Sequence, residues 1–157
     1  MSKHLPIVML AMLMIITLWG AEAPVGAWKV NPARSTWTGD PRLKSLIVRF
    51  QGHLHGEIFT QERIEADGRT ATVSTILYFD GEPRDFQGFG CLGSQLSRRV
   101  DSQSVEILRI CGGGNWTRFI RHWGVPAKEL ILDITEQHSD GRRVERHLVL
   151  EKQLEER

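Results

Sequence analysis

The sequence predicts an all-β protein, a single up-and-down antiparallel meander of eight to ten strands. Between residues 26 and 153, short runs alternate apolar and polar residues, as half-buried strands do. Asp-Gly pairs, a strong hairpin signal, separate several of these runs at Asp67-Gly68, Asp80-Gly81 and Asp140-Gly141. No run in this range has a sustained helical period. A meander of this length rolls into a barrel or folds into a sandwich, since both limit exposed edges, and we favour the barrel.

The first half of the domain contains five of the predicted strands. The clearest is 70–79, where Val73, Thr75, Leu77 and Phe79 share one face. The segment 31–41, rich in turn residues, is predicted to be a loop that carries the first strand to a new partner. The five strands are 28–31, 43–50, 57–65, 70–79 and 86–89.

The second half contains five more, at 95–100, 105–110, 116–121, 129–137 and 144–151. The first two form a hairpin around Asp101-Ser102-Gln103, and Gly112-Gly113-Gly114 turns the chain into the next. In the last strand, Val144, Arg146, Leu148 and Leu150 lie on one side. Sequential strands joined by such short turns lie side by side and run antiparallel.

The N-terminus reads as a secretory signal peptide. Lys3 precedes an uncharged run from Leu5 to Trp19, and small residues follow up to Ala23. We expect a signal peptide at 1–23 and one barrel domain at 24–157, exported to the periplasm or the extracellular space. The alternative is an uncleaved membrane anchor, although the apolar run is shorter than the roughly 20 residues that span a bilayer.

The charges give no sign of a nucleic-acid partner. The chain has 20 basic and 19 acidic residues, and the basic ones are scattered rather than clustered. We read most of them as the solvated outer face of a sheet. The sequence predicts no nucleic-acid binding, no membrane span after signal cleavage and a monomer.

The two cysteines, Cys91 and Cys111, are placed symmetrically about residue 101, the turn of the 95–110 hairpin. Antiparallel pairing therefore brings them near each other across the ladder. In a secreted protein, an even number of cysteines at such a spacing indicates a disulfide. A pair of free buried thiols is the alternative.

The order of several short phrases resembles a known family. The phrases are the opening Gly26-Ala27-Trp28-Lys29-Val30-Asn31, the mid-chain Tyr78-Phe79-Asp80-Gly81, the hairpin at 97–106 and the ending at 130–153. Together they are similar to the small secreted lipocalin-like β-barrel proteins of Acidobacteria and related bacteria. The resemblance implies a lipocalin-like, calycin-type barrel that binds something apolar, and it implies no catalytic residues. This chain departs from the family at both cysteines, at 112–114, and at Trp116, His122 and Trp123.

The same resemblance implies a structural role for Trp28. In the lipocalin signature, a tryptophan at this place closes the barrel floor and an arginine of the last strand packs across it. A cation over an indole face is favourable by about 0.5–2 kcal/mol. Arg143 and Arg146 are the candidates for that arginine.

Metal, cofactor and catalytic motifs are weak. His53 and His55, with Glu57 beyond them, could bind zinc, but Gly52 and Gly56 favour an exposed turn, so we predict no metal site. The isolated His122, His138 and His147 indicate no haem, and we expect no cofactor. There is no Gly-x-Ser-x-Gly elbow, and the glycine run is not followed by Lys-Ser/Thr. We therefore predict no enzyme.

The remaining candidates for a binding site are the apolar side chains at alternating positions of the strands. A barrel of this size is either filled by side chains or holds one small ligand. Residues that could line such a cavity, or simply form the core, are Phe50, Phe59, Val73, Leu77, Phe79, Ile107, Trp116, Leu132 and Leu148.

Three functions follow from these observations. The first is a binding protein for a small apolar or amphipathic ligand, without catalysis. The second is a ligand-free module of the cell envelope that acts through its surface and has a fully packed interior. The third, an enzyme, needs polar groups converging inside the barrel, whereas the sets of residues predicted to face inward are chiefly aliphatic and aromatic.

Overall fold

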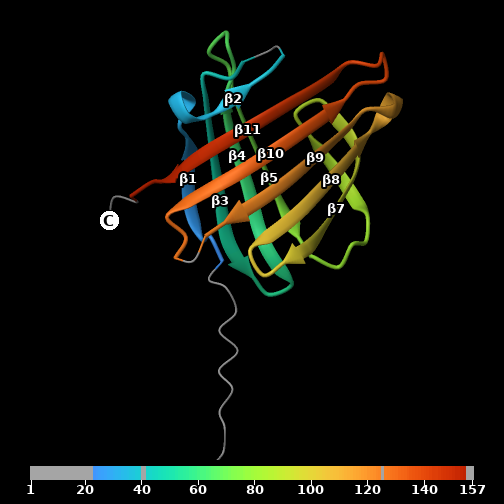
Figure 1. Ribbon diagram of the computed structural model, residues 1–157. Coiled ribbons are helices and arrows are strands. Elements are labelled where there is room, and N and C mark those ends of the chain that lie inside the picture. Colours follow the sequence, from blue (N-terminus) through green and yellow to red (C-terminus); the bar gives the residue numbers. More distant parts are fainter. Residues whose placement is uncertain (1–22, 40–41, 125, 155–157) are drawn as a thin grey trace, which may run out of the picture.

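The computed structural model describes residues 23–39, 42–124 and 126–154, so the predicted signal peptide lies almost wholly outside it. Within these ranges the chain forms eleven strands and two three-residue 3-10 turns (Figure 1). The strands are β1 Gly26–Val30, β2 Thr36–Trp37, β3 Ser45–His53, β4 Gly56–Ile64, β5 Thr70–Leu77, β6 Arg84–Gly88, β7 Cys91–Asp101, β8 Ser104–Cys111, β9 Trp116–Trp123, β10 Glu129–Gln137 and β11 Arg143–Lys152. The 3-10 turns are η1 Pro32–Arg34 and η2 Gly112–Gly114.

Ten strands form one nearly closed antiparallel barrel. Their order is β5-β4-β3-β1-β11-β10-β9-β8-β7-β6, so β1 joins the two halves by pairing with both β3 and β11. Figure 1 shows β1 beside β11 and β3, with β5 and β6 as the two ends of the sheet. The all-β prediction is confirmed, and each predicted strand overlaps an observed one.

The predicted loop at 31–41 has more structure than the sequence suggested. The side chain of Asn31 accepts hydrogen bonds from the backbone of Ala33 and Arg34, which caps η1. The chain then leaves the barrel wall, and β2 pairs with the start of β11 at Arg146 and His147. This detour places Trp37 over one end of the barrel.

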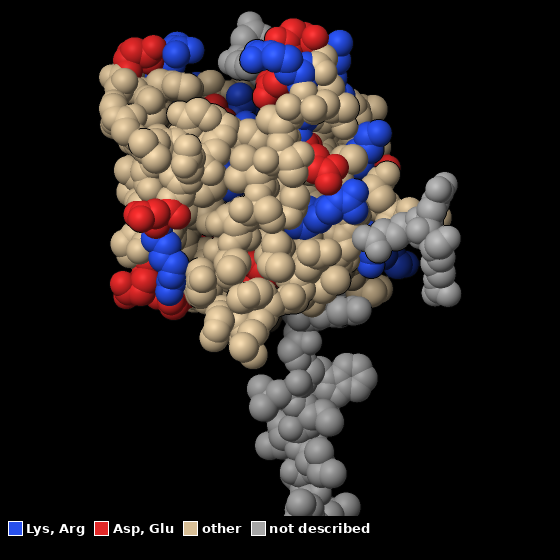
Figure 2. All heavy atoms as spheres, turned by 180° about the vertical axis from the view of Figure 1, so that it is seen from behind, with Lys and Arg blue, Asp and Glu red and all other residues tan. Residues whose placement is uncertain are grey.

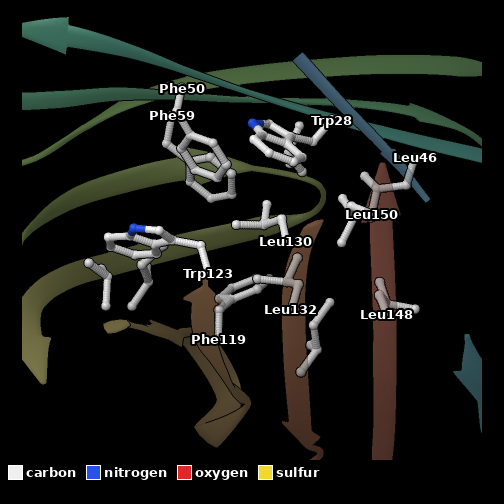
Figure 3. Close-up of a cluster of buried hydrophobic side chains, with 14 of the residues drawn as sticks. Trp28, Leu46, Phe50, Phe59, Phe119, Trp123, Leu130, Leu132, Leu148 and Leu150 are labelled. Atoms are coloured by element: carbon white, nitrogen blue, oxygen red, sulfur yellow. The ribbon is translucent and has the colours of Figure 1, made fainter. Parts of the chain in front are cut away.

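The core packs toward the opposite end, where the β3–β4 and β7–β8 hairpins turn. Phe50 and Phe59, paired across β3 and β4, stack with ring centroids 5.1 Å apart. Trp28 is fully buried, and its indole N–H donates to the carbonyl of Pro24 at 2.9 Å. Figure 3 shows these rings pointing toward Trp123 and Leu130 in the barrel interior. The buried position of Trp28 agrees with its predicted structural role.

The cation expected over Trp28 is a different residue. Lys152 pairs with Trp28 across β11 and β1, and its Nζ lies 5.7 Å from the centroid of the indole ring. Arg146 lies farther along β11, opposite Trp37, and its guanidinium stacks 4.5 Å from that ring. Arg143 is exposed and pairs with Glu145. The register of β11 therefore corrects the assignment of Arg143 or Arg146 to Trp28.

The predicted disulfide between Cys91 and Cys111 is present, with 5.1 Å between the Cα atoms. The register of β7 and β8 places Gly93, not Cys91, directly opposite Cys111, because the hairpin turns at Ser102 and Gln103, between the paired Asp101 and Ser104, and not symmetrically about residue 101. The bridge is therefore diagonal. It joins the start of β7 to the end of β8, at the same end of the barrel as Trp37.

Candidate functional site

A cavity of about 410 Å³ occupies the end of the barrel that the core leaves free. In Figure 1 this is the upper end, where the β4–β5 and β10–β11 turns lie. Its apolar walls include Trp37, Leu43, Phe86 and Phe119, and the Cys91–Cys111 bridge lies at its side. Three arginines, Arg63, Arg109 and Arg146, also line it. The cavity thus combines aromatic walls with positive charge.

Arg109 lies deepest among these arginines, with 3% of its surface exposed. Its Nε donates to the amide oxygen of Gln95 and its Nη1 to that of Gln61, both at 2.8 Å. Its Nη2 is buried and has no hydrogen-bond partner. The guanidinium lies 4.2 Å from the ring centroid of Phe86. No carboxylate of the described residues forms an ion pair with it.

Burial, followed by the charge of Arg63, lowers the pKa of Arg109 to about 9. Both causes act against the charged form, and no described acid acts in its favour. At neutral pH Arg109 is therefore a desolvated cation, held by two neutral amides, with one free donor beside a cavity.

Arg63 and Arg146 lie nearer the mouth and share acidic neighbours. Arg146 Nη1 donates to Glu136 Oε1 at 2.6 Å, and Glu136 also attracts Arg63. The guanidinium of Arg63 lies 3.7 Å from the ring centroid of Phe89. The Nε atoms of both arginines are buried without a partner. Burial, the largest cause, lowers the pKa of Arg63.

A fourth interior arginine lies at the closed end and is neutralised. Arg121 is 1% exposed and makes a two-pronged ion pair with Glu57, whose Nη2–Oε2 distance is 3.3 Å. Its guanidinium also lies 4.1 Å from the ring centroid of Phe50. Burial lowers the pKa of Arg121, and Glu57 opposes that effect. Arg109 and Arg121 are thus both buried, but Arg121 has a carboxylate partner and Arg109 has none among the described residues.

The predicted lining residues mostly form the core. Phe50, Phe59, Leu77, Ile107, Leu132 and Leu148 are all fully buried in the main cluster, and Phe79 packs against it. Val73 is partly buried on β5. Trp116 is partly buried and alternates with the inward-facing Thr117 and Phe119, which places it on the other side of the β9 wall. None of these nine is among the described residues that line the cavity.

The prediction of an interior without converging polar groups is wrong. Arg109, Arg121 and Arg146 alternate with buried apolar neighbours along β8, β9 and β11. The alternation itself was a usable signal: Ile107 and Arg109 share a face, as do Phe119 and Arg121. The expectation that most basic residues lie on the solvated outer face is wrong for Arg109 and Arg121, both of which are buried. When apolar residues two positions before and after an arginine are predicted to be buried, the arginine shares their face of the strand and also points inward.

The predicted absence of a metal site rested on His53, His55 and Glu57. Their surroundings differ: the two imidazoles lie 5.7 Å apart on an exposed turn, while Glu57 points inward to Arg121. Among the described residues, no three His, Cys, Asp or Glu side chains gather as a metal-ion ligand set. No helix within the same ranges is long and apolar enough to cross a membrane.

The outer surface carries mixed charge. Figure 2 shows Lys and Arg side chains next to Asp and Glu on the face seen from behind. Ion pairs elsewhere on the outside of the barrel include Glu106 with Arg98 and Arg118, and Asp80 with Arg84. On the face that Figure 2 shows, the two kinds of charge are interspersed.

Comparison with known proteins identifies the fold. No model of a known protein family matches the chain, and no curated protein sequence matches it. Among solved structures, a Schistosoma mansoni fatty acid binding protein in complex with arachidonic acid is similar, with a TM-score of 0.55 and 11% identity over 86% of this chain and 99% of that one. A zebrafish ileal bile acid-binding protein complexed with cholic acid has a TM-score of 0.52 and 12% identity, over 82% and 98%.

At such identities the likeness establishes the fold alone. This chain has a nearly closed ten-stranded antiparallel barrel, the fold that it shares with these two solved structures.

Proposed function

We propose that this protein is a secreted, lipocalin-like binding protein for a small amphipathic ligand with one anionic group, held in the barrel interior without catalysis. The observation that carries the proposal is Arg109, a buried cation beside the cavity with no carboxylate partner and an unpaired Nη2. The anionic group of the ligand would pair with Arg109, and its apolar body would lie toward the mouth.

The energetics of buried charge favour an anion at this place. An ion taken out of water without a counter-charge costs several kcal/mol. Arg121 offsets that cost with Glu57, whereas Arg109 has only the amide oxygens of Gln61 and Gln95. A carboxylate, sulfate or phosphate at Nη2 would supply the missing charge and the missing acceptor together.

The rest of the cavity suits an apolar body. Phe86, Phe119, Trp37 and Leu43 form its walls, and a volume of about 410 Å³ lies within the usual range for small-ligand sites, roughly 300–1,000 Å³. A module that acts only through its surface would need a filled interior, so this open space supports the binding function over that alternative.

The solved structures support the same ligand class. The fatty acid binding protein holds arachidonic acid and the bile acid-binding protein holds cholic acid, and each ligand joins a carboxylic acid to a large apolar body. The Cys91–Cys111 bridge, together with the apolar N-terminal run, supports export to an oxidising compartment.

The test compares a charged and a neutral ligand of equal length. Dodecanoate and dodecanol are titrated calorimetrically into wild-type protein, into Arg109→Gln and into Arg99→Gln, an exposed control that is not among the residues lining the cavity. We expect wild type and the control to prefer dodecanoate by roughly 10- to 100-fold, the range of a hydrogen bond between charged groups. Arg109→Gln should lose most of this preference while keeping its affinity for dodecanol.

Equal binding of dodecanoate and dodecanol by wild type would contradict the proposal, and so would an unchanged preference in Arg109→Gln. The near-ultraviolet circular dichroism spectrum identifies a variant that has lost its packed interior. In that case Arg109→Lys, which keeps the charge, replaces it and should retain part of the preference.

A further inference from the structure

A second hollow lies outside the barrel wall, between the η1–β2 segment and the start of β3. Its volume is about 490 Å³. Its apolar floor is formed by Val30, Trp37 and Leu43, each partly buried and packed on its inner side against the core. We call this hollow the outer groove.

The outer groove exists because of the detour after β1. Asn31 caps η1 and turns the chain away from β3, and β2 then pairs with β11 rather than with β3. The first residues of β3 therefore lack a neighbour on that side. The groove is the space left open beside these residues. Its shape depends on η1, capped by Asn31, and on the short pairing of β2 with β11.

The rim of the outer groove is positively charged. Lys29, Arg42 and Lys44 line it, all three exposed, and no Asp or Glu is among the described residues that line it, a set without residues 40 and 41. The hydroxyl groups of Ser35 and Ser45 complete the polar lining. Cations around an apolar floor are complementary to a molecule with one anionic group and an apolar body.

The outer groove also adjoins the interior cavity. Trp37, Leu43 and Leu46 line both spaces. Trp37 has its indole N–H buried without a hydrogen-bond partner, and its ring is stacked under Arg146 of the interior. The side chains of these three residues therefore lie between the two spaces.

We propose that the outer groove is a second binding site, which holds one anionic amphiphile with its acidic group between Lys29 and Lys44 and its apolar body over Val30, Trp37 and Leu43. The protein thus has two places for the same chemical class of ligand, one inside the barrel and one outside, on opposite sides of Trp37. The outer site rests on its own lining and does not require Arg109.

The test uses dodecanoate labelled with ¹³C at its carboxyl carbon and observed by NMR. We expect two bound carboxyl resonances in the wild-type protein. The double variant Lys29→Gln/Lys44→Gln should lower the affinity that the outer resonance reports by about tenfold, since each exposed charge contributes up to roughly 1 kcal/mol. The matched control, Arg99→Gln with Lys128→Gln, makes the same change in net charge on exposed residues outside the groove lining and should leave both resonances unchanged.

Arg109→Gln separates the two proposals. It should remove the interior resonance and leave the outer one. A single resonance that Arg109→Gln abolishes would overturn the outer site while the interior site stands, as would two resonances that the double lysine variant does not affect. A single resonance that only the lysine variant weakens would support the outer site and contradict the interior one. No bound resonance at all would contradict both.

Discussion

Gly88 of β6 lies against Val73 of β5, so close that a Cβ at residue 88 would stand 2.7 Å from Cγ2 of Val73. β5 and β6 are the two ends of the sheet and are not hydrogen-bonded neighbours in its order. Side-chain contact therefore carries much of the closure between them. The isolated bridge of Asp80 with Arg98, and Gly81 N–H donating to Ser97 at 2.9 Å, connect the far end of this seam.

The first prediction concerns this contact. Gly88→Ala should lower the free energy of unfolding by about 1–3 kcal/mol, because the stiff, branched Val73 cannot give way without moving β5. Val73→Ala in the same chain should recover part of the loss, and urea unfolding of the two single variants and the double variant measures that coupling. Gly52→Ala, which would meet nothing within 4 Å, is the control. Simple additivity of the two substitutions would contradict the contact.

The second prediction concerns the ion pair of Arg121 with Glu57. Glu57→Gln leaves a buried guanidinium without its counter-charge and should cost about 3–5 kcal/mol in urea unfolding. Adding Arg121→Met should restore much of that loss, because the uncompensated charge is then gone. The exposed pair Arg142–Asp140 is the comparison: Asp140→Asn there should cost far less stability than Glu57→Gln. Equal losses at the two sites would show that burial does not govern the effect.

The third prediction concerns the Cys91–Cys111 bridge. It closes a loop with a sequence separation of 20, for which the chain-entropy relation gives about 3 kcal/mol. Wild-type protein in reductant and the Cys91→Ala/Cys111→Ala variant should both unfold at lower urea than the oxidised protein. Adding reductant to the variant should change nothing. Reduced wild type that unfolds with the oxidised midpoint would refute this prediction.

The fourth prediction concerns Glu106, whose carboxylate accepts from Arg98 and from Arg118, the latter at 2.5 Å. Partial burial raises the pKa of Glu106, but the hydrogen bonds and charges of the two arginines outweigh it, and the net pKa lies below 4.5. The folded state therefore releases this proton more readily than the unfolded chain. The resulting stability is present above pH 4.5 and is lost as the pH falls below it.

Urea unfolding between pH 6 and pH 3 measures this contribution. Wild type should lose stability over this range more steeply than Glu106→Gln, which has no proton to take up at residue 106. Parallel curves for the two proteins would exclude a role for Glu106 in acid unfolding.

The strands were accessible from the sequence because their signals are local. Period-two alternation around Val73 and Leu77, and turns such as Asp140-Gly141, depend on residues within one hairpin. The cysteine pair was accessible for the same reason, since both residues flank a single turn. The structure turns this hairpin at Ser102 and Gln103, so Cys111 lies opposite Gly93 and the bridge is diagonal.

The site was not accessible in the same way. Which arginines face inward depends on partners far along the chain: Glu57 lies 64 residues from Arg121, and Gln61 lies 48 from Arg109. Which end of the barrel stays open depends on the summed volumes of side chains from nearly every strand. Phe50, Phe59 and Phe79, which were expected to line a cavity, instead belong to or pack against the core.

Trp28 has Val48 on one side and Lys152 on the other, so the first strand meets its second neighbour only when the last strand has been made. A growing chain can build the β3–β4 and β7–β8 hairpins early, but until then it is an open ribbon whose inward arginines still touch water. In the folded barrel, β11 completes the sheet between β1 and β10, and Arg109 and Arg121 are enclosed within that completed sheet. Without β11 the remaining strands would form an open sheet and not a smaller closed barrel.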